Sequence, residues 1–181
     1  MSLEKSKIKL ETGDQAPDFS LLGIDDKQYS LADFTDFESV LIIFMCNHCP
    51  YVKAKIDVLN NLQKKYSSQL AIVGINSNDP NYPGEGMELM KEFTKEHKIN
   101  YFYLLDDSQD TAKSYGATCT PDPFLLNKEH KLVFHGRLNN QMQPEDKSTE
   151  ETMELKIEQL LKNEKISDDF LPSMGCSIKW L

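Results

Sequence analysis

The sequence has no long apolar stretch, few cysteines and fewer basic than acidic residues. No segment of its 181 residues approaches the roughly 20 consecutive apolar residues that a membrane helix needs. Residues 1–15 are charged rather than apolar, so they do not resemble a secretion signal. We therefore expect a soluble, cytoplasmic protein with no membrane partner. A net charge of −9 would repel nucleic acids and anionic lipids, so we expect no nucleic-acid partner either.

Four cysteines are too few for a disulfide scaffold in a chain of this size. An apolar fraction of 39%, with nine Phe, is enough for one sizeable hydrophobic core. We predict a single domain over residues 1–181, with a core of residues 15–165 and a C-terminal tail of residues 166–181. The four cysteines are therefore of interest for their chemistry.

Short apolar runs, typical of strands covered on both faces, alternate with apolar residues at steps of three and four, which indicate helices. The predicted strands are residues 40–45, 70–75, 101–105, 124–126 and 132–134, the last two forming a hairpin. The predicted helices are one from near Cys46 to Tyr66, then 87–97, 109–115 with Gly116 as a left-handed cap, and 150–161. An additional hairpin is expected within residues 19–31. This order predicts an α/β fold with a central mixed sheet flanked by helices.

The candidate active site is the segment Cys46-Asn47-His48-Cys49-Pro50, directly after the predicted strand 40–45. If a helix begins near Cys46, its unpaired N–H groups and its dipole favour a thiolate on Cys46. Two intervening residues would let Cys49 reach Cys46 and resolve a mixed disulfide. We therefore predict that Cys46 has the lower pKa and attacks, and that Cys49 resolves. A protonated His48 would stabilise the thiolate and make the pair more oxidising.

Other interpretations of the cysteine pair stay open. Both cysteines could be small buried core residues. Structural zinc needs four ligands, but Cys119 and Cys176 are isolated, and His97, His130 and His135 show no paired spacing. Copper held by both thiolates and His135 is the better metal hypothesis, since soft thiolates suit Cu(I). We expect no metal or other cofactor.

Several separated motifs agree in order along nearly the whole chain. They are Gly13-Asp14-Gln15-Ala16-Pro17-Asp18-Phe19, the strand leading into Cys46-Asn47-His48-Cys49-Pro50, Ser77-Asn78-Asp79, Tyr115-Gly116-Ala117-Thr118-Cys119-Thr120-Pro121 and Gly175-Cys176-Ser177-Ile178-Lys179-Trp180. Together they resemble the peroxiredoxin-like (redoxin) branch of the thioredoxin superfamily.

This resemblance implies a thioredoxin-like fold and a thiol–disulfide oxidoreductase active in cell redox homeostasis. Its partners would be protein or small-molecule disulfides and thiols, and a dithiol reductant. The resemblance also implies a cis bond before Pro121, beside the active cysteines, that exposes the preceding backbone to a substrate strand. Asn47 and Thr120 are then expected to contact the substrate.

The sequence departs from that of true peroxiredoxins, whose active-site motif has the pattern P-x-x-x-T-x-x-C. Aligning the last position on Cys49 places Ile42 at the proline and Cys46 at the hydroxyl. The only arginine, Arg137, lies beyond the terminal hairpin. A thiol peroxidase, in which one cysteine forms a sulfenic acid and another condenses with it, is therefore the alternative enzyme. A copper-binding or metal-delivery module is the alternative outside enzymes.

The C-terminal tail contains Cys176, Ile178 and Trp180 and is too apolar to be unattached. We expect both Ile178 and Trp180 to be buried against the body of the protein. Cys176 would then be either a small apolar filler or a third redox partner of the Cys46–Cys49 pair. The sequence assigns no role to Cys119.

Overall fold

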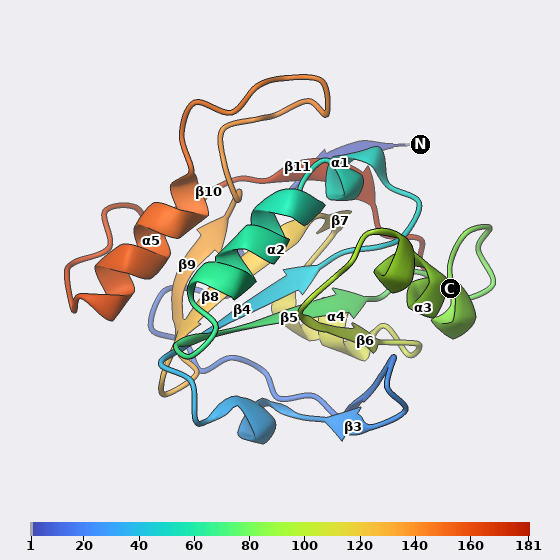
Figure 1. Ribbon diagram of the computed structural model, residues 1–181, viewed down its shortest axis with the longest axis horizontal. Helices are drawn as coiled ribbons and strands as arrows, with labels where there is room; N and C mark the ends of the chain where they lie inside the picture. The colour runs from blue at the N-terminus through green and yellow to red at the C-terminus, as the bar shows by residue number, and fades with distance from the viewer. Residues whose placement is uncertain (1) are drawn as a thin grey trace.

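In the computed structural model, which describes residues 2–181, a mixed sheet of eight strands runs through the protein (Figure 1). Its strands lie in the order β10 (Phe170–Leu171), β9 (Leu132–Gly136), β8 (Asp122–Asn127), β4 (Ser39–Phe44), β5 (Leu70–Asn76), β6 (Phe102–Leu105), β2 (Leu21–Gly23) and β3 (Gln28–Tyr29). Strands β4, β5 and β6 are parallel, whereas β8 and β2 run antiparallel to their inner neighbours. Because β4 and β5 are parallel, the loops that follow them meet at one edge of the sheet.

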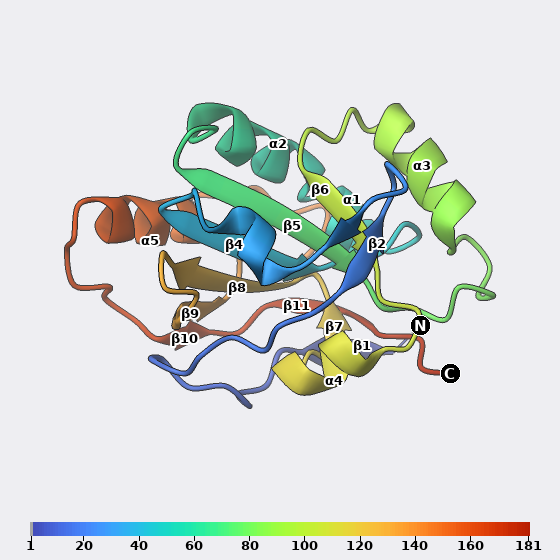
Figure 2. The same cartoon turned by 90° about the horizontal axis from the view of Figure 1, so that it is seen from below.

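Helices cover both faces of this sheet, as Figure 2 shows. One face carries α1 (Pro50–Lys53), α2 (Ile56–Lys65), α3 (Met87–Glu96) and α5 (Thr152–Leu161); the other carries α4 (Asp110–Tyr115) and the 3₁₀ helix η1 (Leu31–Phe34). The side chains of β4 alternate between the two cores: Leu41 and Ile43 face α2, and Val40 and Ile42 face α4. All six residues of β4 are buried, which its apolar sequence predicts.

A second sheet brings the two ends of the chain together. It contains β1 (Leu3–Lys5), β11 (Met174–Ser177) and β7 (Cys119–Thr120), with β11 in the middle and antiparallel to both neighbours. In Figure 1 the red C-terminal strand lies beside α1 and the blue N-terminal strand. The C-terminal tail is therefore part of the fold next to the first turn after β4.

The predicted strands and the terminal β8–β9 hairpin are confirmed, with ends that differ by one or two residues. The hairpin expected within residues 19–31 is confirmed as β2 and β3, and β2 also extends the main sheet by pairing with β6. Gly116 has a positive φ of 75° and caps α4 as predicted. Within residues 2–181, no helix combines the length and the apolar character that crossing a bilayer requires.

The predicted helix start near Cys46 is wrong. Helix α1 begins at Pro50, and Cys49 is its N-cap residue with an extended backbone (φ −74°, ψ 121°). The physical reason is Pro50: its ring disfavours a helical conformation for the preceding residue, while Pro itself suits the first helical position. The helix also does not continue to Tyr66, because it breaks at Ala54 and Lys55 before α2 begins.

The end of the tail is held differently from the prediction. Ile178 is buried, but Trp180 is 43% exposed, so the expected burial of Trp180 is wrong. Polar contacts hold the last residues instead: Gln109 donates to the Lys179 carbonyl (2.9 Å) and accepts from the Leu181 N–H (2.9 Å). These hydrogen bonds fix the terminus without requiring the indole ring to be buried.

Candidate active site

Cys46 and Cys49 lie at the carboxyl end of β4, beneath the second sheet. Both side chains are fully buried, and both approach Thr120. Cys46 Sγ is 3.2 Å from Thr120 Oγ1, and Cys49 Sγ is 3.4 Å from the Thr120 carbonyl oxygen. The bond between Thr120 and Pro121 is cis, as the resemblance implied. The structure thus brings Cys46, Cys49, Thr120 and Pro121 together.

Cys49 has the environment that favours a thiolate. A hydrogen bond from the Cys46 thiol and contacts with Cys176 and the backbone of Val52 outweigh burial and lower the pKa of Cys49 to about 5. Cys49 is the N-cap residue of α1, and the Val52 N–H near its sulfur donates to the Cys49 carbonyl at 3.1 Å. Cys49 is therefore ionised at neutral pH.

Cys46 has the opposite environment. Its hydrogen bond to Cys49, its burial and the nearby carboxylate of Glu85 raise the pKa of Cys46 well above its usual value. The sequence-based prediction that Cys46 has the lower pKa is therefore wrong. The main cause is the hydrogen bond between the two thiols, which favours the thiolate on Cys49 and disfavours it on Cys46.

At neutral pH the reduced protein should therefore contain one thiolate, on Cys49. Titrating the ultraviolet absorbance of the thiolate should show a transition near the Cys49 pKa of about 5, and Cys49→Ala should remove it. Cys119→Ala is the matched control. Burial raises the pKa of the Cys119 thiol, so this variant should keep the transition near pH 5. A transition that persists in Cys49→Ala and disappears in Cys46→Ala would restore the assignment made from the sequence.

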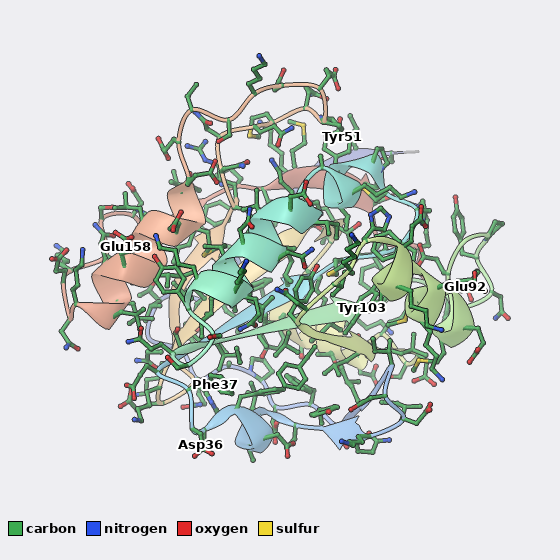
Figure 3. The ribbon with its side chains drawn as sticks, in the orientation of Figure 1. Asp36, Phe37, Tyr51, Glu92, Tyr103 and Glu158 are labelled. Carbon is green, nitrogen blue, oxygen red and sulfur yellow. The ribbon has the colours of Figure 1, made fainter. Side chains whose placement is uncertain are left out.

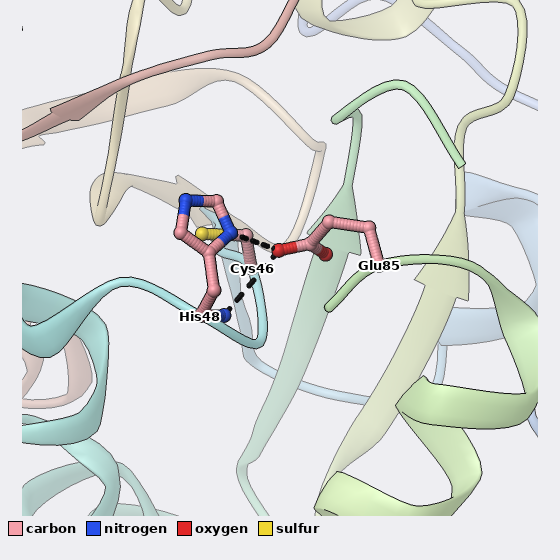
Figure 4. A group of neighbouring side chains, drawn as sticks. All are labelled: Cys46, His48 and Glu85. Carbon is pink, nitrogen blue, oxygen red and sulfur yellow. Dashed lines mark hydrogen bonds and ion pairs between the residues drawn. The ribbon is translucent and has the colours of Figure 1, made fainter. Parts of the chain in front are cut away.

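Glu85 is a site residue that the sequence analysis missed. Its carboxylate is buried and accepts from the backbone N–H groups of Asn47 (3.4 Å) and His48 (3.3 Å) and from Asn76 Nδ2 (2.6 Å). It also pairs with His48 Nδ1, as the dashed lines in Figure 4 show. Burial would raise the Glu85 pKa, but the hydrogen bonds from His48 and Asn76 hold it below its usual value. Glu85 thus fixes the turn between the two cysteines.

The pairing with Glu85 changes the expected role of His48. The predicted role was a positive charge acting on Cys46, but the imidazole is paired with a carboxylate that itself raises the Cys46 pKa. His48 is therefore placed to partner Glu85, and its effect on the redox potential stays a prediction. The parallel arrangement of β4 and β5 was the signal that could have located Glu85, since the loops after both strands meet at this edge.

Asn47 is buried and makes hydrogen bonds with three other residues. Its N–H donates to Glu85, its amide nitrogen donates to the Gly84 carbonyl (3.1 Å), and its amide oxygen accepts from the Tyr103 hydroxyl (2.9 Å). Tyr103 reaches it from β6 in the middle of the molecule (Figure 3). Substrate contact by Asn47 stays a prediction, whereas these bonds give it a structural role in the turn.

Within residues 2–181, one group of side chains has metal-ligating atoms close together: Cys46, His48 and Glu85, within 4.8 Å of one another. Both Glu85 oxygens already accept hydrogen bonds, so a metal ion would have to displace them. The copper ligand considered from the sequence, His135, is not in this group. His135 Nε2 instead pairs with Asp122 Oδ1 at 2.7 Å in the core.

Cys176 lies against the active pair. It is fully buried in β11, and its Sγ is 2.7 Å from Cys49 Sγ. In the reduced protein, burial and contact with Cys49 raise the pKa of Cys176 to about 12. Cys119 is also buried, on β7 opposite Ser177.

Known proteins resemble this chain in sequence. The sequence model of the Redoxin family matches residues 11–153. A curated relative, the thiol-disulfide oxidoreductase ResA of Bacillus thuringiensis subsp. konkukian (strain 97-27), is 24% identical over 126 residues, which are 69% of this chain and 69% of the relative.

Solved structures extend the similarity to the whole chain. An uncharacterized conserved protein from Geobacillus kaustophilus is 34% identical, with a TM-score of 0.93, covering 100% of this chain and 97% of that one. A hypothetical protein of Sinorhizobium meliloti 1021 is also 34% identical, with a TM-score of 0.91 and 99% coverage of both chains. The thioredoxin domain of a thiol-disulfide oxidoreductase from Bacteroides vulgatus, 24% identical with a TM-score of 0.61, covers 70% of this chain and 89% of that one. This match and the mixed sheet flanked by helices confirm the predicted thioredoxin-like fold.

Proposed function

Because the chain belongs to the Redoxin family, we propose that it is a thiol–disulfide oxidoreductase whose working pair is Cys46 and Cys49. The observation that supports this most is the position of Cys49 at the N-cap of α1, with the Cys46 thiol as a hydrogen-bond donor to its sulfur. A low-pKa thiolate next to a second thiol is what disulfide exchange requires.

We propose that Cys49 is the attacking thiolate and Cys46 the resolving thiol, the reverse of the order expected from the sequence. Cys49 attacks one sulfur of a substrate disulfide and forms a mixed disulfide, while the other substrate sulfur leaves as a thiolate. Cys46 then attacks Cys49 Sγ, the Cys46–Cys49 bond forms, and the substrate leaves fully reduced. A dithiol reductant returns the pair to its reduced state.

Thr120 and Pro121 would position the substrate. Thr120 contacts both cysteines, with its hydroxyl on Cys46 and its carbonyl close to Cys49. Its backbone belongs to β7, where an extended substrate chain could pair in place of β11. Action on protein or small-molecule disulfides, a part in cell redox homeostasis and a cytoplasmic location stay predictions.

Peroxide reduction is the second candidate, and an assay separates the two. Reduction of insulin by dithiothreitol should be accelerated by the wild-type protein, and hydrogen peroxide should be consumed more slowly than insulin disulfides are. Cys119→Ser should match the wild type in both assays, because Cys119 contacts neither active sulfur among the described hydrogen bonds. Peroxide consumption without insulin reduction would instead support the thiol peroxidase.

A further inference from the structure

The edge of β7 next to the active pair is already occupied by the protein's own tail. Strand β11 pairs antiparallel with β7, with Cys176 opposite Thr120 and Ser177 opposite Cys119. The Ile178 N–H donates to the Thr118 carbonyl at 3.0 Å and continues this pairing. The tail thus lies along the backbone that a substrate strand would use.

The fit between the two strands depends on Gly175. A Cβ placed on Gly175 would lie 1.8 Å from the Thr120 carbonyl oxygen and 3.0 Å from Pro121 Cδ. Any other residue at position 175 would therefore push β11 away from β7. The close approach sets Cys176 directly over the active pair, with its sulfur 2.7 Å from Cys49 Sγ.

We propose that Cys176 is a third redox cysteine that exchanges with the Cys46–Cys49 disulfide and forms a Cys49–Cys176 disulfide. The inference rests on the proposed function, because it needs the Cys46–Cys49 bridge as its starting point. Cys176 on strand β11 then reacts with the disulfide as an external thiol would. All three sulfurs are buried, so the step needs no thiol from outside the protein.

The exchange balances within the protein. The Cys176 sulfur, after losing its proton, attacks Cys49 Sγ; the Cys46–Cys49 bond breaks and the Cys49–Cys176 bond forms. The electron pair of the broken bond goes to the Cys46 sulfur, which takes up the proton that Cys176 lost. One disulfide and one thiol are present before and after, so the step uses no oxidant or reductant.

In the oxidised protein, Cys49 no longer opposes a thiolate on Cys176. Burial is the first cause of the raised Cys176 pKa, and the other two causes that raise it are the hydrogen bond and the charge of Cys49. Both require Cys49 as a thiolate, so they disappear when Cys49 is in a disulfide. Lys179, whose charge lowers the Cys176 pKa, stays in place. Burial and Glu85 disfavour a charge on the Cys46 sulfur, so this sulfur takes up the proton and ends as a thiol, while its raised pKa slows its departure.

Disulfide mapping tests the proposal. The full-length wild type and Cys46→Ser are equilibrated with oxidised glutathione, quenched with acid, alkylated and mapped by mass spectrometry. We expect a Cys49–Cys176 peptide in the wild type, and also in Cys46→Ser, where Cys176 displaces glutathione from its mixed disulfide with Cys49. Cys176→Ser should give only the Cys46–Cys49 peptide. Cys119→Ser is the matched control and should give the wild-type pattern, because Cys119 is equally buried on the neighbouring strand.

The outcomes separate this proposal from the proposed function. A Cys46–Cys49 peptide in the wild type, with no Cys49–Cys176 peptide in either protein, would overturn the role of Cys176 and leave the oxidoreductase standing. No intramolecular disulfide in any variant would overturn both. The wild-type map decides the question even if Cys46→Ser does not fold.

Gly175→Ala gives an independent readout. Crowding of this size against Thr120 should shift the tail away from β7 and speed alkylation of Cys49 by about tenfold, with loss of the Cys49–Cys176 peptide. The Cys46–Cys49 peptide should persist. An unchanged alkylation rate and an unchanged map would show that β11 does not need to lie against Thr120 for the bridge to form, which contradicts the proposed geometry.

Discussion

Replacing Cys49 with serine should lower the rate of dithiol-driven insulin reduction by at least about a thousandfold, because a serine hydroxyl neither ionises near neutral pH nor forms a disulfide. Cys49 is the cysteine at the N-cap of α1, and its sulfur contacts Cys46, Cys176 and the Thr120 carbonyl. Neither Cys46 nor Cys176 can replace it, because both have raised pKa values in the reduced protein.

Cys46→Ser should retain more activity than Cys49→Ser, because Cys176 can resolve a mixed disulfide on Cys49. The double variant Cys46→Ser/Cys176→Ser should stop at that mixed disulfide, which intact-mass measurement would detect. Cys119→Ser is the control for loss of a buried thiol and should keep wild-type turnover. A greater loss in Cys46→Ser than in Cys49→Ser would show that Cys46 is the nucleophile.

Replacing His135 with leucine should destabilise the protein by about 3–5 kcal/mol, since removing one partner of a buried pair leaves the other charge unpaired. His135 Nε2 lies 2.7 Å from Asp122 Oδ1, with both side chains buried. The imidazole also stacks on Phe124 at 3.9 Å between ring centroids. Burial alone raises the pKa of Asp122, so its carboxyl depends on His135 for compensation. Urea unfolding of the reduced protein would measure the loss.

The double variant Asp122→Val/His135→Leu is the control, and it should be less destabilised than His135→Leu alone because it leaves no orphaned charge. This result would assign His135 to the core. Unchanged stability of His135→Leu, together with loss of Cu(I) binding measured by competition with a chromogenic chelator, would instead support the copper site considered from the sequence.

The central strands could be predicted from the sequence because their buried residues are consecutive apolar residues. Six consecutive buried residues in β4 and seven in β5 produce apolar runs that need no tertiary information. Gly116 was predictable for a similar reason, because the left-handed cap of α4 favours glycine. Element ends were less certain, since they depend on hydrogen bonds that the pattern does not record.

The start of helix α1 at Pro50 could have been predicted from the sequence, but it was placed near Cys46. Pro50 restricts Cys49 to an extended backbone, so the residue before the proline must be the cap. Placing the helix at Cys46 put its first N–H groups beside the wrong sulfur. The order of the two pKa values depends first on the hydrogen bond between the thiols, and for Cys46 also on burial and Glu85, which the sequence pattern does not show.

The contacts of Cys176 could not be read from the sequence, and those of Glu85 could be read only after β4 and β5 were paired in parallel. Glu85 is 37 residues from His48, and Cys176 is 127 residues from Cys49. Only the pairing of β4 with β5 and of β7 with β11 brings them to the active pair. The prediction that Trp180 is buried failed because it assumed that apolar contacts hold the terminus. Hydrogen bonds to Gln109 hold it instead.

The measurement that tests the central claim most directly is the redox equilibrium of the wild-type protein in glutathione buffers, followed by mapping of every disulfide. A dithiol oxidoreductase centred on Cys49 predicts a single two-electron transition, with Cys49 present in every intramolecular disulfide peptide, bridged to Cys46 or to Cys176. A protein that loses no thiols across the range of buffers, or that forms a bridge without Cys49, would contradict the account.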